Sequence, residues 1–294
     1  MSYDIETRKI FNEAQHYYAM GRYEKALAKF DQLLSIHPND NDVLYMRANS
    51  LFGLNRYDEA VDCCSQALAN GFFAADCHYL LGKIFMETNR YVEAEEHFLE
   101  ALRDNPERAD IMATYGYLML KTGHDKKARR LIENALSIDP SDEVVLQYHF
   151  YYHLAKNQRD DQVEALRRYL QTSDSEVRKL IQMGVMEYSS GNYKAARENF
   201  RQAYLLDPTD EHILSILKDL ERSSSIFYFP QRMIERIGGP AVLWIGMVVF
   251  FLILQGLGFS KAIGIISVIY IVLCAYTWIM PLIYKAIQKL RENS

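Results

Sequence analysis

Small, bulky and turn-forming residues recur along the first two thirds of the chain with a period of 34 residues. Three columns of the repeat hold, in turn, Ala26, Ala60, Ala94, Ala128 and Ala196; Pro38, Pro106, Pro140 and Pro208; and Phe30, Cys64, Phe98, Ile132, Leu166 and Phe200. Within residues 75–108, apolar positions first follow helical spacing, are interrupted at Asn89 and Arg90, and then follow it again. Each unit therefore predicts two short helices joined by a turn.

Six units tile residues 7–210 without an insertion: 7–40, 41–74, 75–108, 109–142, 143–176 and 177–210. One helix pair cannot bury its apolar face alone, so we expect the units to stack into a solenoid. Residues 211–222 form an amphipathic pattern that predicts a capping helix. The unit 143–176 is divergent, because Phe150 replaces the small residue, Gln162 the alanine and Asp174 the proline. Its phase is intact, and we expect a helix pair with altered packing.

The pattern resembles the tetratricopeptide repeat (TPR) family. The family's small first-helix residue falls at Ala14, Ala48, Gly82, Gly116 and Gly184, in phase with the alanines given above. The resemblance covers residues 7–210 and implies an all-α superhelical solenoid of six helix-turn-helix repeats, occupying residues 1–222 with its cap. It also implies that the first helices of the repeats line a concave groove.

By the same resemblance, fixed columns of each unit face that groove. They contain Phe11, Asn12, Tyr18, Tyr45, Met46, Asn49, Tyr79, Lys83, Tyr117, Tyr148, Tyr151 and Tyr188. Aromatic rings offer apolar area, and hydroxyls and amides can hold backbone groups, so this ladder is suited to a protein or peptide partner. The alternative is that the tyrosines serve packing within the repeats. A clamp of Lys, Asn and Arg, with which some TPR domains hold acidic chaperone C-termini, is absent from these columns.

The C-terminal part predicts a transmembrane hairpin over residues 237–284. Two stretches, 237–260 and 262–284, contain no charged residue, and about 20 such residues suffice to cross a bilayer as a helix. We place the spans at about 239–259 and 262–284, after a linker or interfacial segment at 223–236 and before a basic tail at 285–294. The alternative is a buried helical hairpin of a soluble domain.

Charge predicts the topology of this hairpin. Arg222, Arg232 and Arg236 precede the first span, and Lys285, Lys289 and Arg291 follow the second, whereas the connector holds Lys261 alone. The positive-inside rule then puts both termini in the cytoplasm, and the N-terminus shows no secretory signal. We expect an integral protein of a membrane, the bacterial inner membrane, with a cytoplasmic solenoid. The acidic solenoid is poorly suited to nucleic acid.

No motif in the chain predicts catalysis, a cofactor, a metal or a small-molecule substrate. His149 and His153 stand four residues apart, which puts both imidazoles on one helical face, yet no third ligand is predictable. No nucleotide-binding loop, serine-hydrolase elbow or zinc-protease motif occurs. We therefore do not expect an enzyme.

These features together predict a membrane-anchored TPR adaptor or scaffold that holds a protein partner at the cytoplasmic face of a membrane. Two alternatives remain open. One is a structural or assembly subunit of a membrane complex, since small residues such as Gly246 and Gly264 ease helix approach. The other is a chaperone for a secreted or membrane substrate.

Overall fold

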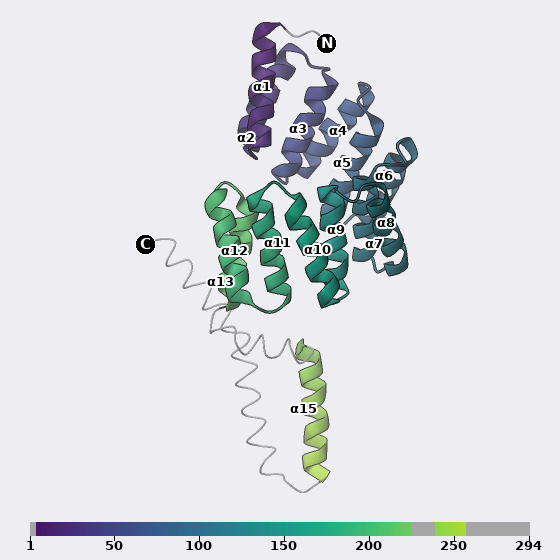
Figure 1. Ribbon diagram of the computed structural model, residues 1–294, viewed down its shortest axis with the longest axis vertical. Coiled ribbons are helices and arrows are strands. Elements are labelled where there is room, and N and C mark those ends of the chain that lie inside the picture. The colour runs from purple at the N-terminus through teal and green to yellow at the C-terminus, as the bar shows by residue number, and fades with distance from the viewer. Residues whose placement is uncertain (1–3, 225–238, 257–294) are drawn as a thin grey trace.

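The computed structural model describes residues 4–224 and 239–256, all of whose regular elements are α-helices. The twelve helices of the repeats are α1 Ile5–Ala19, α2 Tyr23–Ile36, α3 Asn41–Gly53, α4 Tyr57–Ala69, α5 Ala74–Glu87, α6 Tyr91–Asp104, α7 Ala109–Lys121, α8 Asp125–Ile138, α9 Glu143–Ala155, α10 Arg159–Thr172, α11 Glu176–Ser189 and α12 Tyr193–Leu206. They stack as six successive pairs (Figure 1), and α13, Glu211–Ser224, covers the last pair. The predicted all-α solenoid is confirmed.

Small residues let the two helices of a pair cross closely. A Cβ added to Gly82 of α5 would lie 2.6 Å from the Phe98 ring of α6, and one added to Gly184 would lie 2.8 Å from Phe200. Ala94 of α6 is fully buried at the same crossing. A larger side chain would therefore separate the helices, which explains the spacing of small residues in the sequence.

Each first helix ends in a left-handed residue that turns the chain into the second helix. This column, again 34 residues apart, holds Gly21, Asn55, Asn89, Gly123, Asn157 and Gly191, all with φ between 54° and 81°. At Asn89 the following amide, that of Arg90, donates back to the Phe85 carbonyl at 2.8 Å, which closes the helix end. Asparagine and glycine tolerate this conformation better than other residues, so they terminate the helix at the same place in every unit.

The divergent fifth unit keeps the same architecture. Phe150 of α9 and Gln162 of α10 are both buried where other pairs place a small residue and an alanine. The Gln162 amide donates to the His153 carbonyl at 3.2 Å, so its polar group is satisfied. The expected helix pair with altered packing is present.

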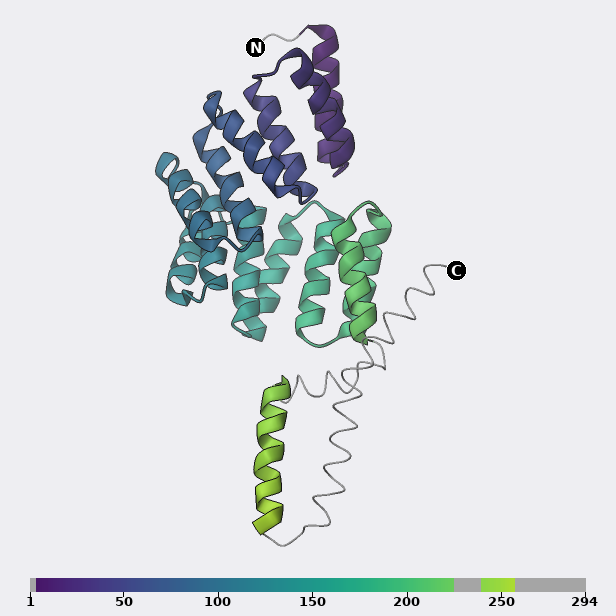
Figure 2. The same ribbon diagram turned by 180° about the vertical axis from the view of Figure 1, so that it is seen from behind.

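The array curls back on itself, so that its two ends approach each other (Figures 1 and 2). The turns after α1 and α3 and the segment between α12 and α13 enclose a cavity of about 760 Å³. A Cβ added to Gly21 would lie 3.8 Å from Oδ2 of Asp207. The first two repeats contribute Arg22, Glu24, Lys25 and Arg56 to its lining, and the C-terminal segment contributes Asp207 and Asp210.

Helix α15, Gly239–Gly256, is the described part of the first predicted span, and it stands apart from the solenoid in both views. It carries no charged residue, and Trp244, Ile245 and Val249 are each at least half exposed. Within residues 4–224 and 239–256, no helix is both long and apolar enough to cross a membrane. Residues 225–238, the second predicted span and the basic tail lie outside the described residues.

Candidate functional site

Side chains from three consecutive first helices, α5, α7 and α9, form an aromatic strip. The Tyr79 hydroxyl of α5 lies 3.0 Å from the Thr114 hydroxyl of α7. Tyr117 of α7 stacks on Tyr148 of α9, with ring centroids 4.9 Å apart, and lies 5.7 Å from the Tyr151 ring. Four of the predicted groove tyrosines are therefore brought together across three repeats.

Tyr151 extends the strip to the sixth repeat. Its hydroxyl accepts hydrogen bonds from the Gln147 amide at 3.2 Å and from the Gln182 amide of α11 at 3.1 Å. Because both bonds use oxygen lone pairs, the hydroxyl keeps its own proton for a further acceptor. A carbonyl group of a bound peptide is an acceptor of this kind.

Lys83 of α5 lies among the rings at the other end of the strip. Its Nζ is 4.6 Å from the centroid of the Tyr79 ring and 5.2 Å from that of Phe52. Burial lowers the pKa of Lys83 to about 8. Below that pH the side chain presents a cation that is held by ring faces, and such a cation can meet a carboxylate of a partner.

The acidic residues of the same helices are used within the chain. Arg108 forms a two-bond contact with the Asp110 carboxylate, both bonds 2.8 Å long, and a third bond of 2.8 Å to Asp76 of the preceding repeat. Asp76 and Asp110, near the starts of α5 and α7, are therefore tied together across neighbouring repeats through Arg108. Arg108 and Thr114 are absent from the predicted groove residues and are brought to the strip by the stacking of repeats.

The tyrosine hydroxyls of the strip stay protonated at neutral pH. Burial raises the pKa of Tyr45, Tyr79 and Tyr148 well above the ordinary value. Each hydroxyl can therefore act as a hydrogen-bond donor as well as an acceptor.

The remaining predicted residues lie on α1, α3 and α11, outside the strip. Tyr45 stacks on Phe72 at 4.3 Å, and the Asn49 amide donates to the Tyr45 carbonyl. In the first repeat, Phe11 and Tyr18 pack against the buried cluster around Phe30, as does Met46 of the second repeat. Asn12 lies exposed in a shallow hollow on α1. Tyr188, 52% exposed, lines a separate pocket of about 380 Å³ with residues of α12 and α13.

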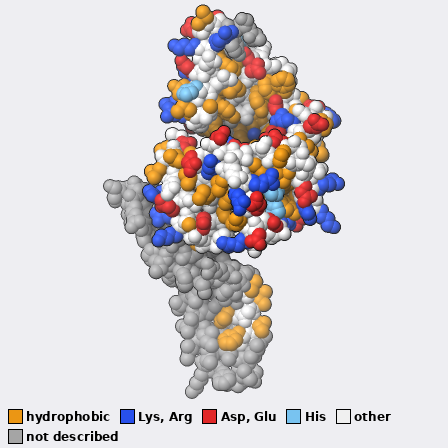
Figure 3. Space-filling model, in the orientation of Figure 1, with side chains coloured by type: hydrophobic (Ala, Val, Ile, Leu, Met, Phe, Trp, Pro, Cys, Tyr) orange, Lys and Arg blue, Asp and Glu red, His pale blue; other side chains and the backbone are white. Residues whose placement is uncertain are grey.

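In the space-filling view, the surface is hollowed between the N-terminal repeats and the repeats that follow (Figure 3). Hydrophobic side chains gather at this hollow, with acidic side chains beside them.

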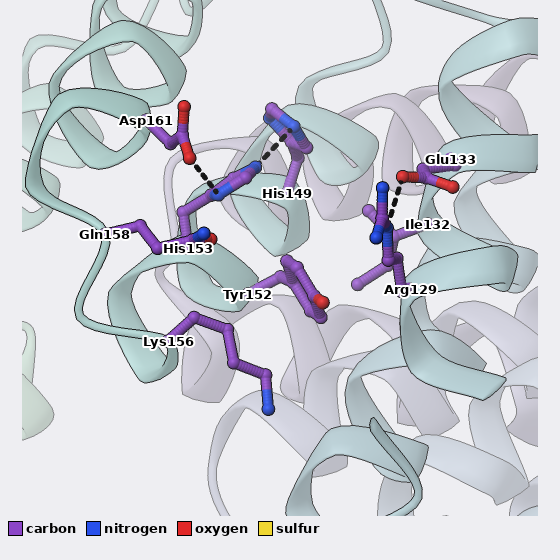
Figure 4. A pocket seen from close by; sticks show the side chains of 9 residues that line it. All are labelled: Arg129, Ile132, Glu133, His149, Tyr152, His153, Lys156, Gln158 and Asp161. Carbon is purple, nitrogen blue, oxygen red and sulfur yellow. Dashed lines mark hydrogen bonds and ion pairs between the residues drawn. The ribbon is translucent and has the colours of Figure 1, made fainter. Parts of the chain in front are cut away.

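Another pocket, of about 370 Å³, is lined by His149, Tyr152 and His153 of α9 (Figure 4). Residues of α8 and the start of α10 also line it. His149 and His153 point toward each other, with their Nε2 atoms 3.0 Å apart. Burial, with the neighbouring His153, lowers the pKa of His149 to about 4.

Comparison with known families identifies the repeats. Models of the tetratricopeptide repeat match residues 11–75, 85–147 and 180–210, which together make up just over half of the chain. The chain belongs to the tetratricopeptide repeat family. The three matches leave out the divergent fifth unit, whose helix pair is seen only in the structure. TPR domains of this kind are scaffolds for protein–protein interaction, and the fold is typically not catalytic.

Solved structures share the TPR fold. A tetratricopeptide repeat protein from Parabacteroides merdae is 16% identical over 75% of this chain and 86% of its own, with a TM-score of 0.59. PilW, described as a widely conserved type IV pilus biogenesis factor, is 20% identical over 73% of this chain and 100% of its own, with a TM-score of 0.52. At these identities the likeness concerns the fold alone. A search of curated proteins found no match.

Proposed function

We propose that this TPR protein is a membrane-anchored adaptor that binds a protein or peptide partner in its concave groove at the cytoplasmic face of a membrane, the bacterial inner membrane. The observation that carries the proposal is the aromatic strip of Tyr79, Thr114, Tyr148, Tyr117 and Tyr151, which crosses three repeats without interruption.

The chemistry of the strip supports a peptide rather than a small molecule. Tyrosines supply large rigid contact areas at low entropic cost, and their hydroxyls can reach successive carbonyl groups of an extended chain. Lys83 adds one positive charge among the rings, which is suited to an acidic residue of the partner. An elongated surface with repeated donors matches the repeated carbonyls of a backbone.

The membrane anchor rests on the composition of the C-terminal part. The exposed apolar side chains of α15 are costly to leave in water, and contact with lipid would bury them. The cations that flank the two uncharged stretches support cytoplasmic termini.

Site-specific photocrosslinking in cells that make the full chain tests the proposal. A photoreactive phenylalanine replaces Tyr117 in the groove or Val163, a half-exposed residue of α10 outside the strip. We expect one defined adduct from position 117, recovered with the membrane fraction, and no such adduct from position 163. Equal adducts from both positions, or recovery in the soluble fraction, would count against the groove and the anchor respectively.

One observation favours the alternative of an assembly subunit in a membrane complex. A Cβ added to Gly246 of α15 would meet no atom of the described residues within 4 Å, and a small residue of this kind would allow another helix to approach closely. Under this alternative, the detergent-solubilised chain co-purifies with fixed membrane subunits, and the complex survives mutation of the groove tyrosines.

A further inference from the structure

We propose that His149 and His153 bind a divalent transition-metal ion that prefers tetragonal coordination, copper(II) or nickel(II), in the pocket of the divergent fifth repeat. The side chains of α9 that line this pocket are not those of the aromatic strip, and the site is independent of partner binding in the groove.

The two Nε2 atoms share an imidazole–imidazole hydrogen bond of 3.0 Å, and a metal ion would take the place of its proton. Metal–imidazole bonds of about 2.0–2.1 Å and the Nε2–Nε2 separation of 3.0 Å give a nitrogen–metal–nitrogen angle of about 90–97°. Such an angle is typical of adjacent ligands in tetragonal or octahedral coordination. A tetrahedral ion would need the nitrogens about 3.3 Å apart, so the pair is better suited to copper or nickel than to zinc.

The orientation of the two rings differs from that of another close histidine pair in the chain. The planes of His149 and His153 are 81° apart and their rings meet edge to face. His78 and His97 are also close, with Nδ1 atoms 2.9 Å apart, but their rings are stacked at 27°. The two pairs therefore differ in the angle between their ring planes, which makes His78 and His97 a comparison pair of similar nitrogen separation and different orientation.

The surroundings of the two rings also favour metal binding at their Nε2 atoms. Nδ1 of both rings is buried without a hydrogen-bond partner, although Asp161 Oδ2 lies 3.7 Å from that of His153. A small movement of Asp161 would make the carboxylate–imidazole bond that commonly orients a metal-binding histidine. Among the residues that the structure describes, no three His, Cys, Asp or Glu are placed to hold an ion. Water would therefore complete the coordination, and the pocket has room for several molecules.

Comparison with the other repeats shows that the His153 imidazole is a local departure from an apolar position. The position of His153 is occupied by Leu51, Phe85 and Met119 in the three preceding repeats, and all three are buried. An apolar side chain would pack here without an unpaired polar atom, so packing alone does not account for His153.

Titration of the untagged full chain in detergent with copper(II) tests the site. Calorimetry should show one equivalent bound, and electron paramagnetic resonance should show coupling to two imidazole nitrogens. The variants His149→Asn and His153→Asn should each fail to bind this copper ion, whereas His97→Asn should bind it as the wild type does. Asp161→Asn should bind the copper ion about tenfold more weakly. Circular dichroism of each variant checks that it folds.

Two results would overturn the proposal. One is copper uptake by His149→Asn equal to that of the wild type, with or without coupling to nitrogen. The other is wild-type protein that takes up no more copper than the double variant His149→Asn and His153→Asn. Nickel bound more tightly than zinc supports the tetragonal assignment, and the reverse order contradicts it.

Discussion

Lys83 carries its charge among aromatic rings, and this placement makes stability depend on pH. Folding lowers its pKa from 10.5 to about 8, so between these values the unfolded chain holds more protons than the folded chain. The destabilisation from burying the cation is complete below about pH 8 and is relieved as the pH rises toward 10.5.

We therefore expect Lys83→Met to raise the melting temperature more at pH 7 than at pH 10, as measured by circular dichroism. The matched control is Lys126→Met, since Lys126 is an exposed lysine of α8. An increase that is the same at both pH values would show that the effect comes from side-chain packing and not from the charge.

Ala94 tests the close crossing of a helix pair. It is fully buried where Gly82 of α5 contacts Phe98 of α6, so a larger side chain has no space. Ala94→Leu should destabilise the solenoid by about 1–3 kcal/mol through overpacking, as measured by urea unfolding. Val92→Leu on the same helix, at a residue 70% exposed, should change stability by far less. Equal destabilisation by the two substitutions would show that Ala94 does not lie at a close helix crossing.

At the scale of elements, the helices were predictable and several of their contacts were not. Columns of Ala, Gly and Pro placed every helix pair, including the divergent fifth, because the period survives three substitutions. The left-handed column of Gly21, Asn55 and their equivalents could have been found by the same search. Arg108 could not, because its column holds Ala74 in the preceding repeat and the helix-capping Asp142 in the following one.

The groove tyrosines show a second limit of what repeat positions in the sequence can predict. Column positions place Tyr79 and Tyr117 on the first helices, but stacking between repeats depends on superhelical geometry. The rings prove half-buried against one another, with Tyr45 stacked on Phe72. The sequence allowed two interpretations of these tyrosines, contact with a partner and packing within the repeats. Both interpretations therefore concern the same rings.

Replacement by phenylalanine separates these two roles. Tyr45→Phe and Tyr79→Phe together keep the rings and remove the hydroxyls, so the melting temperature should change little while crosslinking from position 117 to the partner falls. The corresponding alanine double variant should lower both the melting temperature and the crosslinking, because ring contacts disappear as well. Unchanged crosslinking in the phenylalanine variant would show that these hydroxyls have no role in recognition.

At the scale of the whole molecule, the composition changes sharply after the cap. Residues 4–224 form the solenoid, and the uncharged stretches lie beyond it. A fragment of residues 1–224 should stay in solution as a strongly helical species, whereas the full chain should require detergent. Sedimentation and circular dichroism measure both properties. Aggregation of the fragment to the same extent as the full chain would contradict this division.

The approach of the two ends alters how this repeat array can unfold. In a linear array each repeat contacts only its neighbours, so terminal repeats fray independently. Here Asp207 and Asp210 line the same cavity as the turns of the first two repeats, so opening the array would expose the residues of both ends to more water. Replacing Arg22 and Lys25 with glutamate should therefore speed amide hydrogen exchange in α12 and α13, as well as in α1 and α2. Any partner that spreads the array on entering must supply the free energy of that opening, which lowers its apparent affinity and slows its entry.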